Sequence, residues 1–195
     1  MRKNVLIVQG HPDASPQRFC RHFAEAYTES AIAAGHTVEN IDIASLDFPL
    51  LRTKADYENG QTPPGLRRAR QLLADADHIV LIFPLWLGDL PALVKGFLEQ
   101  ILRPGFAYRG NMDDGKFQKL LKGKSARIVV TMGMPAVIYR VYFGAHGLKN
   151  LRRNILGFCG VGPIRETLIG LIEQKNPKSR QKWLARAQAL GRKGE

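Results

Sequence analysis

Residues 77–102 read DHIVLIFPLWLGDLPALVKGFLEQIL, and this stretch decides the fold. Residues 79–83 form an unbroken apolar run that is rich in β-branched side chains and too short for an ordinary helix, which predicts a strand buried on both faces. From Leu90 to Leu102 the apolar residues fall three and four apart, as on one face of a helix. The turn between them, PLWLGD, follows the carboxyl end of the strand, where open parallel sheets bind ligands. It is therefore a candidate site.

Working outward, further short apolar runs predict strands at residues 5–8, 38–43, 126–131 and 161–169, and Pro163 favours an edge position for the last of these. Helical spacing occurs at 20–34 before Gly35, at 66–76, at 148–156 and after the capping pair Asn176 and Pro177. Residues 44–65, 103–117 and 132–147 have no sustained period and are predicted as loops.

Five strands alternating with five helices predict one α/β domain over residues 1–195. We expect a flavodoxin-like, doubly wound, five-stranded parallel sheet of order 2-1-3-4-5, with right-handed crossovers. In that order the loops GHPDAS, PLWLG and TMGMP, which follow the first, third and fourth strands, emerge at the same edge. Three unusual loops should then converge on one crevice.

The formal charge of +12 is the outlier of the composition, and it favours anionic partners such as nucleotides, nucleic acid or acidic lipid without choosing among them. The basic residues are spread along the chain, so a solvated basic surface is the simpler interpretation. Cys20 and Cys159 lack metal-ligand or disulfide spacing and are interpreted as packing residues, and no metal site is expected. No apolar run approaches the roughly 18 residues that span a bilayer. We expect a cytoplasmic protein without an integral membrane segment.

The first loop, GHPDAS, leads into a helix, whose free N–H groups and dipole favour a phosphate. Ser15 can cap that helix or bond an anion, and His11 can add a charge-assisted bond or be structural. Two nucleotide signatures are absent. The GKS at 123–125 precedes a strand and lacks the glycine of a P-loop, and GFCGVG is not GxGxxG, which argues against a dinucleotide-binding Rossmann domain.

Together these residues resemble the flavodoxin-like NAD(P)H:quinone oxidoreductase family, of the quinone reductase and modulator of drug activity type. The resemblance spans nearly the whole chain, and FPLWLGDLPALVKGFLEQ is its most specific element. FAYRG, TMGMP and the His-Gly pair at 146–147 recur in the family's order. The resemblance implies a non-covalent FMN or FAD, with its phosphate on the first loop and its ring held by the second and third loops.

The residues that the resemblance assigns to the flavin are His11, Ser15, Arg18, Phe19 and Cys20 for the phosphate and ribityl region, Pro84, Leu85, Trp86, Leu87 and Gly88 along the ring, and Thr131, Met132, Gly133 and Met134 in the third loop. From its residue types alone, the second loop has a second interpretation, in which Trp86 and Leu87 fold back onto the helix. The chain also departs from the family pattern. Met132 and Met134 replace a hydroxyl and a glycine, and Cys20 stands where asparagine is common.

By the same resemblance, Tyr139 and His146 are the catalytic candidates, placed near the flavin C2 carbonyl and N1, where negative charge develops. The alternative is that Tyr139 only packs and that His146 caps the helix beginning near Gly147. Phe106 and Tyr108 are the substrate candidates. With Trp86 they would form an apolar slot for flat acceptors, which in this family usually lies at a homodimer interface.

The implied activity is ping-pong: NAD(P)H gives a hydride to flavin N5 and leaves, and a quinone, azo or nitro compound then takes two electrons. One alternative is a flavin-bearing ancillary subunit that regulates a potassium-efflux transporter, as other relatives of this fold do. Another is a nucleic-acid-binding module, but the chain lacks the interleaved aromatic residues and recognised motif of such modules, so no nucleic-acid partner is expected.

Overall fold

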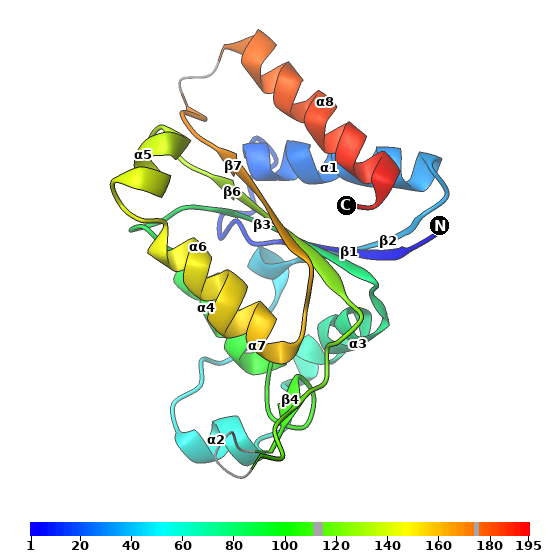
Figure 1. Cartoon of the computed structure of the whole chain (residues 1–195), viewed down its shortest axis with the longest axis vertical. Coiled ribbons are helices and arrows are strands. Elements are labelled where there is room, and N and C mark those ends of the chain that lie inside the picture. Colours follow the sequence, from blue (N-terminus) through cyan, green and yellow to red (C-terminus); the bar gives the residue numbers. More distant parts are fainter. Residues whose placement is uncertain (111–114, 174–175) are drawn as a thin grey trace.

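A sheet of five parallel strands organises the molecule. The computed structural model describes residues 1–110, 115–173 and 176–195 (Figure 1). The strands are β1 (Asn4–Gln9), β2 (Thr37–Asp42), β3 (His78–Pro84), β6 (Ser125–Thr131) and β7 (Ile164–Ile169). They pair in the order β2-β1-β3-β6-β7, each parallel to its neighbour. The predicted order 2-1-3-4-5 is confirmed, with the last strand at an edge.

Helices cover both faces of this sheet (Figure 1). One layer holds α1 (Phe19–Ala33) and α8 (Pro177–Lys193), and the other holds α3 (Arg67–Asp75), α4 (Ala92–Ile101) and the run α6 (His146–Asn150), η3 (Leu151–Leu156) and α7 (Gly157–Cys159). Strand residues alternate between the layers, so that Val5 and Ile7 of β1 pack with α1 while Leu6 and Val8 pack on the opposite side. This double burial explains why the strands read as continuous apolar runs.

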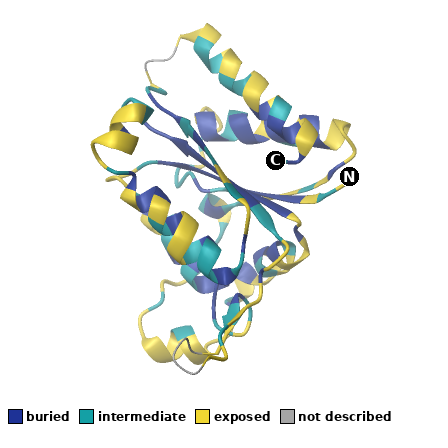
Figure 2. Ribbon diagram, viewed as in Figure 1, coloured by how far each residue is buried: buried dark blue, intermediate teal, exposed yellow. Residues whose placement is uncertain are grey.

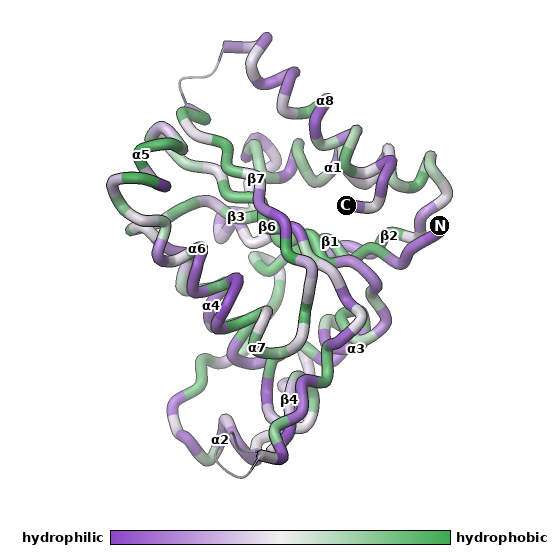
Figure 3. Tube along the Cα trace, in the orientation of Figure 1, coloured by the Kyte–Doolittle hydropathy of each residue, from purple (hydrophilic) through white to green (hydrophobic). Residues whose placement is uncertain are grey.

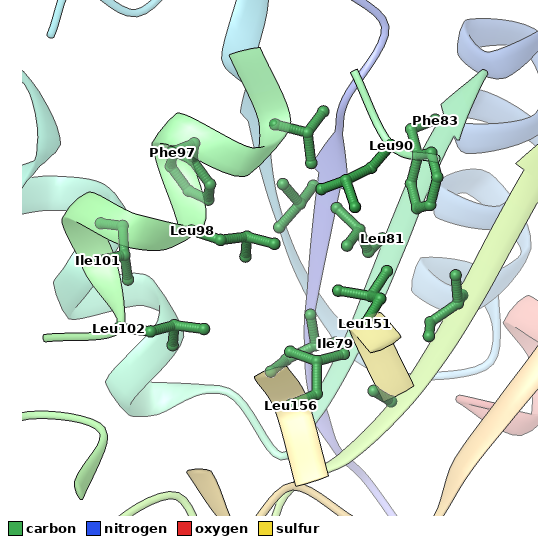
Figure 4. Packing of buried hydrophobic residues seen from close by; sticks show 14 of the residues in the cluster. Ile79, Leu81, Phe83, Leu90, Phe97, Leu98, Ile101, Leu102, Leu151 and Leu156 are labelled. Carbon is green, nitrogen blue, oxygen red and sulfur yellow. The ribbon is translucent and has the colours of Figure 1, made fainter. Parts of the chain in front are cut away.

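The central strand β3 shows the effect most fully, since all seven of its residues are buried (Figure 2). On one of its faces, Ile79, Leu81 and Phe83 meet the apolar side of α4, which includes Phe97 and Leu98 (Figure 4). Burying each such side chain contributes about 1.5–3 kcal/mol. Residues 77–102, which contain β3 and α4, therefore form the centre of the core.

The predicted signals at two helix ends are confirmed. Gly35 has a φ of +86°, and the Gly35 and His36 N–H groups donate to Ile32 and Ala31 O at 2.9 and 3.0 Å, which is a Schellman motif after α1. At the start of α8, Asn176 Oδ1 accepts the Ser179 N–H at 2.9 Å. These local patterns are readable because they involve residues within five positions of one another.

Some segments predicted as loops contain short elements, and there the prediction is wrong. They hold η1 (Ile43–Ser45), α2 (Lys54–Asn59), η2 (Pro64–Leu66), α5 (Ala136–Val141) and the hairpin of β4 (Tyr108–Arg109) with β5 (Gln118–Lys119). Elements of two to six residues are too short to show a repeating apolar period. Residues 111–114 of the Gly-rich segment lie outside the described residues. No helix in the described ranges is long and apolar enough to cross a membrane.

Candidate functional site

Three loops meet at the carboxyl edge of the sheet because β1, β3 and β6 are adjacent and parallel. Backbone bonds join them: the Gly10 N–H donates to Ile82 O and the Leu85 N–H to Thr131 O, both at 2.7 Å. Between the loops lies a cavity of about 480 Å³. Its lining residues are His11, Asp13, Gln17, Arg18, Phe19, Cys20, Pro84, Leu85, Trp86, Thr131, Met132, Gly133, Ile172, Glu173 and Arg180. The predicted convergence of the three loops is therefore present.

The first loop is organised around Asp13. This carboxylate accepts the Ser15 N–H at 2.8 Å and Arg18 Nε–H at 2.7 Å, and these two bonds lower its pKa. The Asp13 N–H in turn donates to His11 Nδ1 at 3.0 Å. Burial, and then the charge of Arg18, lower the pKa of His11, so the ring is neutral at pH 7 with its proton on Nε2. His11 is thus arranged as a hydrogen-bond donor beside Trp86, with ring centroids 6.3 Å apart.

Helix α1 begins at this loop with an open N-terminus. Its N-cap residue, Arg18, makes no side-chain cap, and no acidic residue lies in the first turn. The first N–H groups of a helix carry partial positive charge when no cap satisfies them. An anionic group of a ligand is therefore favoured at this end of the cavity.

Cys20 and Thr131 join the first and third loops at the cavity wall. Their Sγ and Oγ1 atoms lie 3.4 Å apart, and both residues are buried. Burial raises the pKa of the Cys20 thiol to about 11, so the group is protonated at neutral pH and acts as a small packing residue. Ser15 is not among the cavity-lining residues, and its hydroxyl is bonded to Gln17 Oε1.

The second loop is a tight turn of the type I′ class. The Trp86 and Asp89 backbone groups exchange two bonds of 3.0 Å, and the central residues Leu87 and Gly88 have φ values of +48° and +81°. Leu87 is fully exposed and Trp86 is 48% exposed, so neither side chain folds back onto α4. That alternative interpretation is wrong. Trp86 lines the cavity, whereas Leu87 and Gly88 do not.

In the third loop, the backbone of Met132 is already used in the sheet, since its N–H donates to Ile169 O at 2.9 Å. Gly133 is different: a Cβ placed on it would meet no atom within 4 Å, which leaves open space in the cavity wall. Met134 is half-buried and packs against the α4 side of the core instead of lining the cavity. The loop therefore presents Thr131, Met132 and Gly133 to a ligand.

Tyr139 is 1% exposed and lies behind the second loop. Its hydroxyl donates to Gly88 O at 3.2 Å and accepts the Leu148 N–H at 3.3 Å, so it ties the turn to α6. Burial raises the pKa of this phenol. The His146 side chain is exposed and makes no hydrogen bond to any described residue. Helix α6 has Ala145 as its N-cap and no side-chain cap, so the alternative in which His146 caps this helix is wrong.

Phe106 and Tyr108 lie in other cavities of the same chain. Tyr108 Oη is 2.8 Å from Tyr57 Oη in a cavity of about 490 Å³, and Phe106 contacts Arg70 in another. The expected slot of Phe106, Tyr108 and Trp86 is therefore not formed within one chain. The reason is the direction of α4, which carries the chain from the carboxyl edge of β3 back to the opposite edge before residue 103.

Some lining residues were missed by sequence reasoning. Asp13 is one of them, although an acid two residues after His11 and five before Arg18 is a signal for the hydrogen bonds that it makes in this loop. Ile172, Glu173 and Arg180 follow the edge strand β7, whose carboxyl end also reaches this edge. The loops after parallel strands lie at the same edge of the sheet, and this holds for the loop after β7 as it does for the other three.

Comparison with known proteins places the chain. A family model described as the flavodoxin-like fold matches residues 3–190. The chain belongs to this family. An uncharacterized NAD(P)H oxidoreductase of Haemophilus influenzae is 29% identical over 182 residues, covering 91% of this chain and 89% of that protein. NAD(P)H dehydrogenase (quinone) 1 of Rattus norvegicus is 30% identical over 205 residues, covering 91% and 72% respectively.

A solved structure has a similar fold. The FMN-dependent NADH-azoreductase of Bacillus anthracis, in complex with FMN, matches with a TM-score of 0.74 and 15% identity over 98% of both chains. The family matches confirm the family expected from the sequence and identify the chain as an oxidoreductase of the flavodoxin-like family.

Proposed function

We propose that this protein is a flavin-dependent NAD(P)H oxidoreductase that reduces quinones and similar flat aromatic acceptors. The observation that carries the proposal is the cavity at the carboxyl edge, which combines an uncapped helix N-terminus with an apolar platform. An anionic tail and a flat ring are the two halves of a flavin mononucleotide. The names of the relatives, which include a quinone dehydrogenase and an FMN-bound azoreductase, agree with this assignment.

The residues present fit such a cofactor. The α1 N-terminus, the His11 Nε2–H and Arg18 would hold its phosphate, and Leu85, Trp86 and Met132 would lie along its ring. The open space beside Gly133 leaves room for a flat group. A bound FMN or FAD would supply the two-electron chemistry, taking a hydride from NAD(P)H and passing two electrons to the acceptor. We propose the ping-pong order, because one open crevice would serve both substrates in turn.

Tyr139 and His146 are proposed to stabilise the negative charge that a bound flavin ring would gain when it receives a hydride. The Tyr139 hydroxyl has one hydrogen, and it donates this hydrogen to Gly88 O in a hydrogen bond that holds the second loop in place. To stabilise negative charge on a bound ring it would have to turn that proton away from Gly88. His146 is exposed and needs no such exchange, and it is the better candidate for the donor role. Neither residue lines the cavity in a single chain.

We further propose that the enzyme acts as a cytoplasmic homodimer. The second loop, α5 and the two residues after α5 expose a set of apolar side chains: Trp86, Leu87, Val137, Ile138, Val141, Tyr142 and Phe143. Helix α5 is partly coloured as hydrophobic in Figure 3 and largely as exposed in Figure 2. The Tyr139 bond to Gly88 O joins α5 to the second loop, and so many exposed large apolar side chains on two joined segments indicate an interface. A second copy packed there could bring its Tyr108 to the crevice, which would complete the slot that one chain lacks.

The absorption spectrum of the purified protein tests the proposal. We expect a yellow protein whose released cofactor chromatographs as FMN or FAD. Replacing Arg18 with Gln should weaken flavin binding, while Arg68→Gln, a change to an exposed arginine outside the cavity, should not. A colourless protein that neither flavin can reconstitute would exclude the enzyme assignment. Light scattering tests the dimer separately, since a monomer can still bind flavin.

A further inference from the structure

A second, polar cavity lies away from the flavin crevice. It has a volume of about 740 Å³, within the range of small-molecule sites, and lies between the segment after α2, one side of α3 and the turn after α4. Figure 1 places α2, α3 and β4 together at the end of the molecule away from α5. The charged side chains that line this cavity are Glu58, Arg67, Arg70 and Arg103. No step of the proposed reaction uses it.

The charge of this cavity is unbalanced. Among the described residues that line it, the one acid is Glu58, which is already 3.6 Å from Lys54 Nζ. Arg103 is 7% exposed, and its guanidinium donates to three neutral oxygens among the described residues: Gln100 O, Gln100 Oε1 and Asp56 O. No carboxylate within residues 1–110, 115–173 and 176–195 pairs with Arg67, Arg70 or Arg103. A buried guanidinium without a counter-ion favours an anion beside it.

Two of these arginines, Arg70 and Arg103, are also held in place. The Arg70 guanidinium carbon lies 4.6 Å from the centre of the Phe106 ring, and Arg70 Nη1 donates to Thr62 Oγ1 at 2.9 Å. Gly60 makes room for Arg103, because a Cβ there would lie 2.6 Å from Arg103 Nη1. Arginines fixed before binding lose little conformational freedom when an anion arrives, and each fork can bond a phosphate through two N–H groups.

The geometry points to a binding site for a small molecule that carries a diphosphate. Arg67 and Arg70 are three residues apart on α3 and therefore neighbours on one side of the helix, so each can take one of two linked phosphate groups. The buried charge of Arg103 adds a long-range attraction at the base of the cavity. The volume exceeds what an inorganic phosphate fills and leaves space for an attached group. The site is independent of the flavin crevice.

Calorimetric titration with inorganic pyrophosphate and with ADP, at constant ionic strength, tests this site. Wild-type protein should bind one equivalent of at least one probe. The double variant Arg67→Gln/Arg70→Gln should bind about tenfold more weakly or worse, because each lost arginine removes a charge-assisted bond. Arg68→Gln is the control: it removes one positive charge from the same helix, but Arg68 does not line the cavity and pairs with Glu39 at 3.6 Å.

The flavin crevice also attracts phosphates, and the Arg18→Gln variant separates the two sites. Binding that persists in Arg18→Gln and Arg68→Gln but falls in the double variant supports the proposal. The proposal is overturned if wild-type protein binds neither probe, if binding is lost in Arg18→Gln but kept in the double variant, or if Arg68→Gln weakens binding equally. Arg18 and Arg68 are exposed, so their variants should melt within about 2 °C of wild type. Arg70 is partly buried and bonds Thr62, so a melting curve of the double variant establishes that it is folded at the titration temperature.

Discussion

The Tyr139 hydroxyl provides the sharpest test of how the second loop is held. Replacing Tyr139 with Phe keeps the ring in the core and removes the one atom that bridges Gly88 O and the Leu148 N–H, at 3.2 and 3.3 Å. Gly88 is exposed, so its carbonyl can bond water instead. Leu148 is buried in the first turn of α6, and its N–H would be left without a partner.

The expected loss in free energy of unfolding follows from these two hydrogen bonds. The lost bond to Gly88 contributes at most about 1 kcal/mol, whereas an unsatisfied buried N–H costs about 1–3 kcal/mol. The sum is about 2 kcal/mol, and a chain of this length loses about 2–4 °C in melting temperature for each kcal/mol. We therefore expect Tyr139→Phe to lower the melting temperature by about 4–8 °C.

Urea unfolding and thermal melts of the flavin-free protein measure this effect without any assumption about catalysis. The matched control is Tyr142→Phe, the same chemical change three residues later at a side chain that is 81% exposed. We expect the control to stay within about 0.5 kcal/mol of wild type. If Tyr139→Phe is as stable as Tyr142→Phe, the hydroxyl does not hold the loop, and its only role can be toward a bound ligand.

Three further predictions concern charge. Burial lowers the pKa of His78 to about 4, so between pH 4 and 6.5 the unfolded chain binds more protons than the folded chain. The free energy of unfolding should therefore rise by about 2 kcal/mol from pH 5 to pH 7.5. Urea unfolding of His78→Gln should not show this rise. Thr167→Val removes the acceptor of buried Arg127 Nη1 at 3.0 Å and should cost about 2 kcal/mol in the same assay, whereas Thr37→Val, at an exposed bond to Arg2, should cost little. The chain carries a charge of +12, which should attract anionic NADPH. Flavin reduction by NADPH, measured in stopped flow, should therefore slow as salt rises from about 0.01 to 0.1 M, because the Debye length falls from about 30 to 10 Å. An unchanged rate constant would show that the positive charge does not steer NADPH to the protein.

The fold is largely readable from the sequence because its signals are local. The run at residues 79–83 is apolar throughout, and this predicts a strand between two helical layers without any knowledge of the partners. Gly35 and Asn176 mark helix ends through bonds to near neighbours. Once the strands and helices are known, right-handed crossovers leave few topologies, and the order predicted from them is the one observed.

The candidate site is only partly readable. His11, Trp86 and Thr131 were expected together because each lies at or just after the carboxyl end of a strand, at the same edge of the sheet, and all three line one cavity. Their roles toward a flavin stay predictions. Phe106 was expected to form a slot with Trp86, which the resemblance places at a homodimer interface. Within this chain, α4 carries it to the opposite end of the molecule.

The long strands and helices, their order in the sheet and the edge where three loops converge were thus readable from the residues alone, since these follow from periodicity and chain direction. Only the tertiary structure decided that Leu87 points into solvent, that Tyr139 bridges two segments, and that Arg67, Arg70 and Arg103 share one cavity. These features depend on distances between segments that lie far apart in the chain. Such distances are set by how whole helices pack on the sheet, and no single stretch of residues encodes them.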